Sequence, residues 1–142
     1  MITAVDTSVL LDVFLPDETF GSRSAEWLRG AYDGGAIVIC DLVYAELAPA
    51  FPDRPALDAA LVEINVNLSA IDSSMAWDAG RRWLRYRRAG GKRTRIITDF
   101  LIGAHAVATA ETFLTRDRGF YRSYYPELSR RIPARPTDPA PL

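Results

Sequence analysis

The sequence predicts an α/β fold with a mostly parallel β-sheet. Short apolar runs alternate along the chain with longer segments of helical periodicity, which is the pattern of strand–helix–strand units. The run at residues 36–40 is apolar without alternation, as in a strand that is covered on both faces. The length of 142 residues corresponds to about one domain. Hydrophobic residues make up 49% of the chain and charged residues 25%, which argues against disorder throughout.

Brief runs of apolar or β-branched residues predict the strands. The first run ends directly at Asp6, and the run at residues 112–115 ends shortly before Asp117. The predicted strands are residues 2–5, 36–40, 67–71 and 112–115, with a possible last strand at residues 129–132.

The segments between these strands carry the start and stop signals of helices. Asp72 and Ser73 begin the longest of them, which closes before Gly90 and Gly91. Asp41 is expected to cap one helix and Thr98 another. The predicted helices are residues 7–15, 20–32, 41–48, 53–64, 72–88 and 99–109.

Residues 1–132 are expected to form a single domain. Residues 133–142 hold four of the nine prolines and read as a loose C-terminal tail. The single cysteine and single histidine exclude a disulfide framework, a thiolate zinc site and any site built from two histidines. No apolar run approaches the ~20 residues of a membrane-spanning helix, and the start of the chain has no basic signal segment. A cytoplasmic protein with no membrane partner is therefore expected.

Four carboxylates follow strands of the predicted sheet or begin helices beside it. Asp6 and Asp117 come after strands, Glu46 lies early in a helix after a strand, and Asp99 begins a helix. Ligands of open parallel sheets bind beyond the carboxyl ends of the strands, so these side chains are expected to converge there. Each acid also has a structural interpretation, with Asp6 in a turn or Asp99 favouring the helix dipole. Glu46 is expected on an apolar helix face, where a carboxylate needs a partner.

Convergence of these acids would require a cation or shifted pKa values. Two unit charges ~4 Å apart repel by about 4 kcal/mol at an effective dielectric constant near 20. Carboxylate oxygens are the ligands that Mg²⁺ and Mn²⁺ prefer. One or two such ions can position a water, lower its pKa and stabilise the leaving oxygen of a phosphodiester.

The motifs around these acids resemble those of PIN-domain endoribonucleases, and specifically of the VapC toxins of bacterial type II toxin–antitoxin pairs. The similarity spans about residues 2–132, in the family's order and spacing. It rests on Val-Asp-Thr-Ser at 5–8, Val-Tyr-Ala-Glu-Leu at 43–47, Thr-Asp-Phe-Leu-Ile-Gly-Ala-His-Ala at 98–106 and Leu-Thr-Arg-Asp-Arg-Gly-Phe at 114–120. One departure is Gly103, where the family more often has alanine.

The resemblance implies a PIN-like fold, with a central parallel sheet and helices on both sides, and an acidic metal pocket. Asp6 and Asp99 would be the most direct ligands of Mg²⁺ or Mn²⁺. Asp117 would be a further ligand, and with Glu46 it would complete the pocket and help to orient metal or water. All four acids would be catalytic. Ser8 and Thr115 stand where the family has pocket hydroxyls.

The resemblance also implies partners. These are a structured RNA substrate of the tRNA or rRNA type, a VapB-like antitoxin, and a second copy of the chain in a homodimer or a toxin–antitoxin hetero-oligomer.

Arginines supply a candidate surface for RNA, although the net charge of −1 gives the whole molecule no strong attraction to nucleic acid. Eight of the 17 basic residues fall between positions 81 and 95. Arg81, Arg85 and Arg88 share one helix face, which is either a solvated face partly paired with Asp78 or a track for phosphates. Arg116 either neutralises Asp117 or joins that track.

Three other functions fit parts of the pattern. An RNA-processing PIN nuclease without an antitoxin would have the same acids. A phosphoacceptor domain would need a lysine near the site, and the one lysine, Lys92, lies in a Gly-Gly-Lys-Arg loop. A non-catalytic metal- or RNA-binding module is disfavoured by the presence of all four acids.

Overall fold

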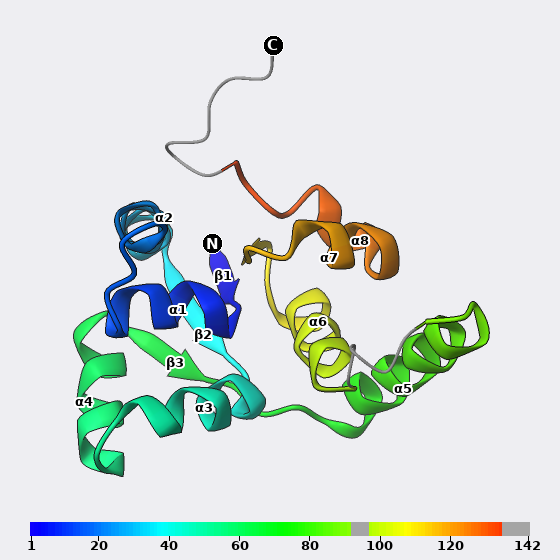
Figure 1. Cartoon of the computed structure of the whole chain (residues 1–142), viewed down its shortest axis with the longest axis horizontal. Helices are drawn as coiled ribbons and strands as arrows, with labels where there is room; N and C mark the ends of the chain where they lie inside the picture. The colour runs from blue at the N-terminus through cyan, green and yellow to red at the C-terminus, as the bar shows by residue number, and fades with distance from the viewer. Residues whose placement is uncertain (92–96, 135–142) are drawn as a thin grey trace.

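A computed structural model describes residues 1–91 and 97–134 of the chain. Four parallel strands form one sheet in the order β3-β2-β1-β4, which places β1 and β2 at its centre (Figure 1). In this register Ala4 lies between Val38 and Phe113. The strands are β1 (Ile2–Val5), β2 (Ala36–Ile39), β3 (Val66–Leu68) and β4 (Thr112–Leu114). The predicted α/β fold with a parallel sheet is confirmed.

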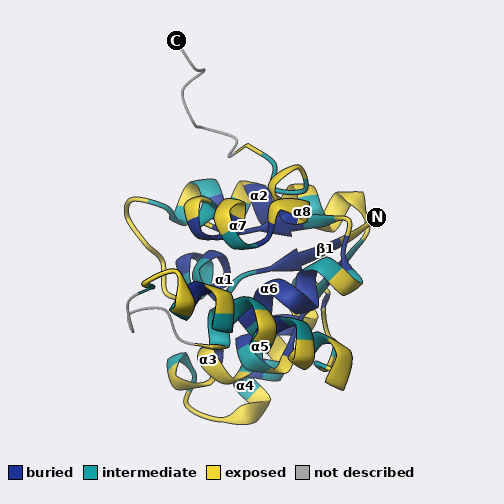
Figure 2. Ribbon diagram, turned by 90° about the vertical axis from the view of Figure 1, so that its right-hand side faces the viewer, coloured by how far each residue is buried: buried dark blue, intermediate teal, exposed yellow. Residues whose placement is uncertain are grey.

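Helices cover both faces of the sheet, as the resemblance implied. Figure 2 shows α2, α7 and α8 on one side of β1 and α3, α4, α5 and α6 on the other, with their buried residues turned inward. The helices are α1 (Thr7–Phe14), α2 (Gly21–Gly34), α3 (Asp41–Leu47), α4 (Arg54–Glu63), α5 (Ser73–Arg88), α6 (Ile97–Thr109), α7 (Arg118–Tyr124) and α8 (Pro126–Ser129), with the 3₁₀-helix η1 (Ala48–Ala50) after α3. No helix in the described part of the chain is long and apolar enough to cross a membrane.

Helix starts follow the predicted signals at some positions and depart from them at others. Asp72 caps α5 by accepting a hydrogen bond from the Met75 N–H at 2.9 Å. Asp41 does not cap α3, because it is the first residue of that helix and Cys40 occupies the cap position. Thr98 does not cap α6 either, since the helix already begins at Ile97.

The C-terminal part of the domain differs most from the prediction. Residues 129–132 form no strand: α8 ends at Ser129, and the Phe113 N–H donates to the Arg131 carbonyl at 2.9 Å beside β4. The short helices α7 and α8 fill residues 118–129, where no helix was predicted. Most of the predicted tail, residues 135–142, lies outside the described residues.

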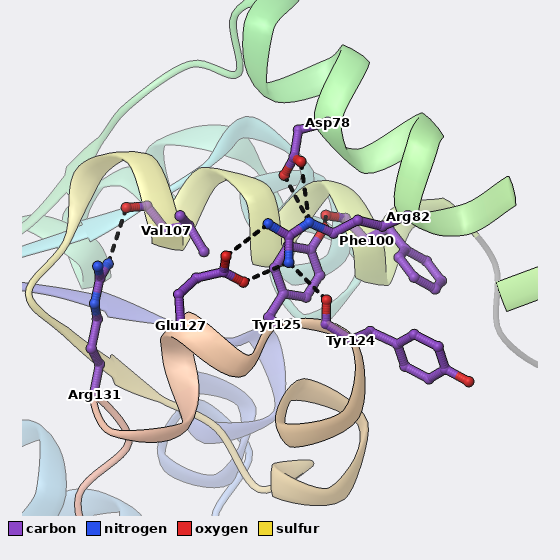
Figure 3. Close-up of polar contacts among 8 residues, drawn as sticks. All are labelled: Asp78, Arg82, Phe100, Val107, Tyr124, Tyr125, Glu127 and Arg131. Atoms are coloured by element: carbon purple, nitrogen blue, oxygen red, sulfur yellow. Dashed lines mark hydrogen bonds and ion pairs between the residues drawn. The ribbon is translucent and has the colours of Figure 1, made fainter. Parts of the chain in front are cut away.

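An arginine and a group of aromatic rings join α5, α7 and α8 to α6. The Arg82 side chain is 11% exposed, and it donates to the carboxylates of Asp78 and Glu127 (Figure 3). Its guanidinium also lies 4.1 Å from the centre of the Tyr125 ring. The Tyr125 hydroxyl donates to the Phe100 carbonyl in the first turns of α6. Because Asp99 precedes Phe100, these contacts help to fix the turn that carries Asp99.

We expect Gly103→Ala to lower the free energy of unfolding by about 1 to 3 kcal/mol, because it overpacks this region. A Cβ at position 103 would lie 2.5 Å from Cε2 of Tyr125, whose ring is fully buried and held by Arg82 and Phe100. This contact explains the glycine where the family more often has alanine. Urea unfolding measures the change.

Gly80→Ala is the matched control. Gly80 lies inside α5, and within the described part of the chain no atom outside the adjacent backbone of that helix lies within 4 Å of its would-be Cβ. Alanine there should raise stability by about 0.5 to 1 kcal/mol through helix propensity. If both variants were equally stable, the Tyr125 ring would not be fixed against α6.

Candidate active site

The four predicted carboxylates line one cavity of about 460 Å³ beyond the carboxyl end of β1. Asp6 follows β1, Glu46 lies in α3, Asp99 is in the first turn of α6, and Asp117 immediately precedes α7. The cavity is lined by Asp6, Thr7, Ser8, Leu11, Glu46, Asp99, Arg116 and Asp117. The carboxylates that were expected to converge beyond the carboxyl ends of the strands therefore line one cavity in the fold.

Asp6 lies at the centre of the hydrogen bonds in this cavity. Its Oδ1 accepts from the Thr7 N–H at 2.8 Å, and its Oδ2 accepts from the Thr115 hydroxyl at 2.7 Å. Burial raises the pKa of Asp6 from 3.8 to about 6, although these two hydrogen bonds oppose the shift. The negative charges of Asp99 and Glu46 make a smaller contribution to this rise.

Glu46 has a hydroxyl partner that the sequence reasoning did not assign. Thr7 donates from Oγ1 to Oε1 of Glu46 at 3.0 Å, so Thr7 connects both Asp6 and Glu46. Partial burial raises the pKa of Glu46, and the charge of Asp99 adds to the rise. Glu46 as a whole residue is exposed beside the cavity and not enclosed by the apolar face of α3, but it has the hydrogen-bond partner that was expected for it. Thr7 follows Asp6 directly in the sequence. That position indicates the start of a helix and does not by itself indicate a contact with Glu46.

The two predicted hydroxyls have different surroundings. Thr115 is fully buried, and its Oγ1 both donates to Asp6 and accepts from the Asp117 N–H at 3.0 Å. It therefore holds the loop after β4 against the end of β1. Ser8 lines the cavity at the start of α1.

The donor set fits a hard divalent cation. Four carboxylates line one cavity. Burial is the main cause of the raised pKa of Asp6, and the negative charges of Asp99 and Glu46 add to it. Within residues 1–91 and 97–134, no three histidine, cysteine or carboxylate side chains form a cluster that could hold an ion together. Mg²⁺ does not need one, because it is usually held by one or two carboxylates and keeps several waters.

The predicted RNA-binding arginines fall into two places. Arg116 lines the cavity, but its Nη2 donates to Asp12 at 3.0 Å, a partner that the sequence did not suggest. Arg81, Arg85 and Arg88 are exposed on α5, away from the cavity lining. Asp78 pairs with Arg82 and, in the described part of the chain, not with these three. Lys92, Arg93 and Arg95 lie outside the described residues.

A family model described as PIN domain matches residues 3–124 of the chain. The chain therefore belongs to the PIN domain family, and the predicted family is confirmed. No curated protein matches it.

Solved structures with this fold come from VapBC and FitAB systems. The structure of VapBC2 from Rickettsia felis, bound to a DNA fragment from their promoter, has 17% identity and a TM-score of 0.69, with 94% of this chain and 98% of that chain covered. VapBC-1 from nontypeable Haemophilus influenzae has 18% identity and a TM-score of 0.69, with 94% and 97% covered. FitAcB from Neisseria gonorrhoeae has 16% identity and a TM-score of 0.65, with 93% and 96% covered. These likenesses show the fold.

Proposed function

We propose that this chain is a metal-dependent endoribonuclease and the toxin of a toxin–antitoxin pair. The observation that carries the proposal is the convergence of Asp6, Glu46, Asp99 and Asp117, from four separate segments, on one cavity. Repulsion between these carboxylates would only destabilise a fold in which they had no function. A nuclease uses it to hold divalent cations, and membership of the PIN family supports that use.

The residues of the cavity have distinct roles in this proposal. Asp6 and Asp99 would hold Mg²⁺ or Mn²⁺ most directly, and Asp117 would complete the set. When bound, the ion supplies Lewis acidity for hydrolysis of a phosphodiester. Glu46, which accepts a hydrogen bond from Thr7, would help to orient metal or water. Glu46 and Thr115 are the two ends of the hydrogen-bond chain Glu46–Thr7–Asp6–Thr115. Ser8 adds a hydroxyl to the lining.

The substrate and partners belong to the same proposal. Arg81, Arg85 and Arg88 would contact phosphates of a structured RNA, because they are exposed and suited to phosphate geometry. The fold shared with VapBC and FitAB chains supports a VapB-like antitoxin as partner. The proposed assembly is a homodimer or a toxin–antitoxin hetero-oligomer. A cytoplasmic location would bring the protein to that RNA.

Cleavage of total RNA by the purified, antitoxin-free protein tests the activity. We expect discrete fragments with Mg²⁺ or Mn²⁺ and none with EDTA. A folded protein that binds Mn²⁺ but cuts no RNA would instead be a binding module. A protein that binds neither ion would contradict the metal pocket itself.

A further inference from the structure

Among the described residues that line the acidic cavity, Arg116 is the one with a positively charged side chain. A phosphodiester is an anion, and a cavity with four carboxylates repels it. The proposed metal offsets part of that repulsion, and a fixed guanidinium at the same cavity would offset more. Arginine also matches the geometry of phosphate oxygens, which it binds through two parallel N–H donors.

Two other residues fix the position of the Arg116 side chain. Asp12 in α1 is 3% exposed, and its Oδ1 accepts from Nη2 of Arg116 at 3.0 Å. The guanidinium carbon also lies 4.2 Å from the centre of the Phe20 ring, so one face of the group is covered. Charge-assisted and stacking contacts of this kind restrict a side chain that is otherwise flexible.

Asp12 is itself held from a second side. The Ser24 hydroxyl of α2 donates to Oδ2 of Asp12 at 2.7 Å, while Arg116 uses Oδ1. The carboxylate therefore has a partner on each oxygen, and it cannot turn without losing one of them. This arrangement connects α1 and α2 to the loop that carries Asp117.

The guanidinium keeps donors for a ligand. It has five N–H groups, and among the described residues its one hydrogen bond is from Nη2 to Asp12. Its side chain is 31% exposed, at the cavity. The neighbouring Arg118 differs, because it donates to the Pro133 carbonyl, packs over Trp27 and does not line the cavity.

We propose that Arg116 binds the phosphate of the scissile or adjacent nucleotide of an RNA, and that Asp12 is the positioning residue that holds it there. This inference rests on the proposed nuclease function, and it adds a phosphate-binding role to one arginine of the site. Phe20 and Ser24 support the same position through the ring face and through Asp12.

Equilibrium binding of a short, fluorescein-labelled single-stranded RNA of mixed sequence tests the proposal. The measurement uses the Asp99→Asn protein, so that bound RNA is not cut. Arg116→Gln should weaken binding by about tenfold to a hundredfold, the value of a charge-assisted hydrogen bond. The slope of log Kd against log salt should fall by about 0.7, since one phosphate contact to a single strand is lost.

Asp12→Asn and the double variant Asp12→Asn/Arg116→Gln complete a cycle. Arg116→Gln leaves Asp12 buried without its cation, whereas the double variant keeps a neutral pair of similar shape and protects the fold. If Asp12 acts through Arg116, the double variant should bind RNA no more weakly than Arg116→Gln alone. Arg29→Gln, an exposed arginine of α2, is the matched control and should keep the original affinity and salt slope.

The inference and the nuclease proposal fail in different ways. Unchanged affinity and salt slope in the folded double variant would overturn the role of Arg116, even if the original protein cuts RNA. An additive loss in the double variant would overturn the role of Asp12. If the original protein cuts no RNA yet loses binding with Arg116→Gln, the phosphate site stands and the nuclease proposal falls. Absence of any binding of this RNA overturns the role of Arg116, and cleavage of total RNA then decides the nuclease proposal separately.

Discussion

Replacement of Asp99 by asparagine is expected to lower the rate of RNA cleavage by about a hundredfold to a thousandfold, the scale seen when a group that stabilises the reaction's charge is removed. Asparagine keeps the size of the side chain and removes the charge that would hold a cation. Asp99 lies in the first turn of α6, which Phe100 and Tyr125 anchor independently. The helix should therefore keep its place, and the loss should be chemical.

Three measurements separate this result from unfolding. Circular dichroism should show the original fold, and cleavage should be measured over time with Mn²⁺. Mn²⁺ should raise the melting temperature of the original protein more than that of the variant, because a bound ion stabilises only the folded chain. Asp33→Asn, an exposed acid of α2, should cut RNA at the original rate. Full activity in Asp99→Asn would remove that residue from the proposed site.

Asp6→Asn should stabilise the metal-free protein at neutral pH while it abolishes cleavage. The Asp6 pKa is raised from 3.8 to about 6 in the fold, chiefly by burial. Between these values the folded protein retains a proton that the unfolded chain has released, so Asp6 makes stability fall as the pH rises from about 4 to about 6. Above that range the penalty approaches about 3 kcal/mol, at 1.36 kcal/mol for each pKa unit. Asparagine does not ionise and so avoids the penalty.

Urea unfolding at several pH values, with EDTA present, checks this prediction. The variant should be more stable than the original protein by about 1 to 3 kcal/mol at pH 7, after allowance for altered hydrogen bonds to Thr7 and Thr115. The gain should vanish below about pH 3, where Asp6 is protonated in both the folded and the unfolded chain. A variant that is less stable at both pH values would show that the ionised carboxylate supports the fold.

The sequence predicted the four strands of the sheet and the longer helices, because their signals are local, but the further strand predicted at residues 129–132 is absent. The apolar run after Gly35 and the cap at Asp72 act within a few residues, and the structure has β2 and α5 at those places. The segment at residues 118–129 lacked such signals. Its helices are 7 and 4 residues long, too short for a periodic pattern, and packing of rings such as Phe120 and Tyr121 into the core decides their structure.

The sequence could predict those parts of the candidate site that depend only on the topology of the sheet. Strand order places Asp6 and Asp117 at one sheet edge, and both line the cavity. The hydrogen-bond partners of the acids could be identified only from the folded structure, because nothing in the sequence pairs Thr7 with Glu46 or Asp12 with Arg116. Those pairs join residues that are 39 and 104 positions apart.

The order of the strands also determines when during protein synthesis the cavity can exist. Asp6 leaves the ribosome well before its partner Thr115, which lies 109 positions later in the chain. β4 must then pair beside β1, which precedes every other strand of this sheet in the sequence. Long-range pairing of this kind is slow, because the chain must close a large loop before the contact forms. A nascent chain or an early-terminated fragment therefore carries isolated acids without the assembled pocket, and the complete set comes together only after nearly the whole domain has been translated.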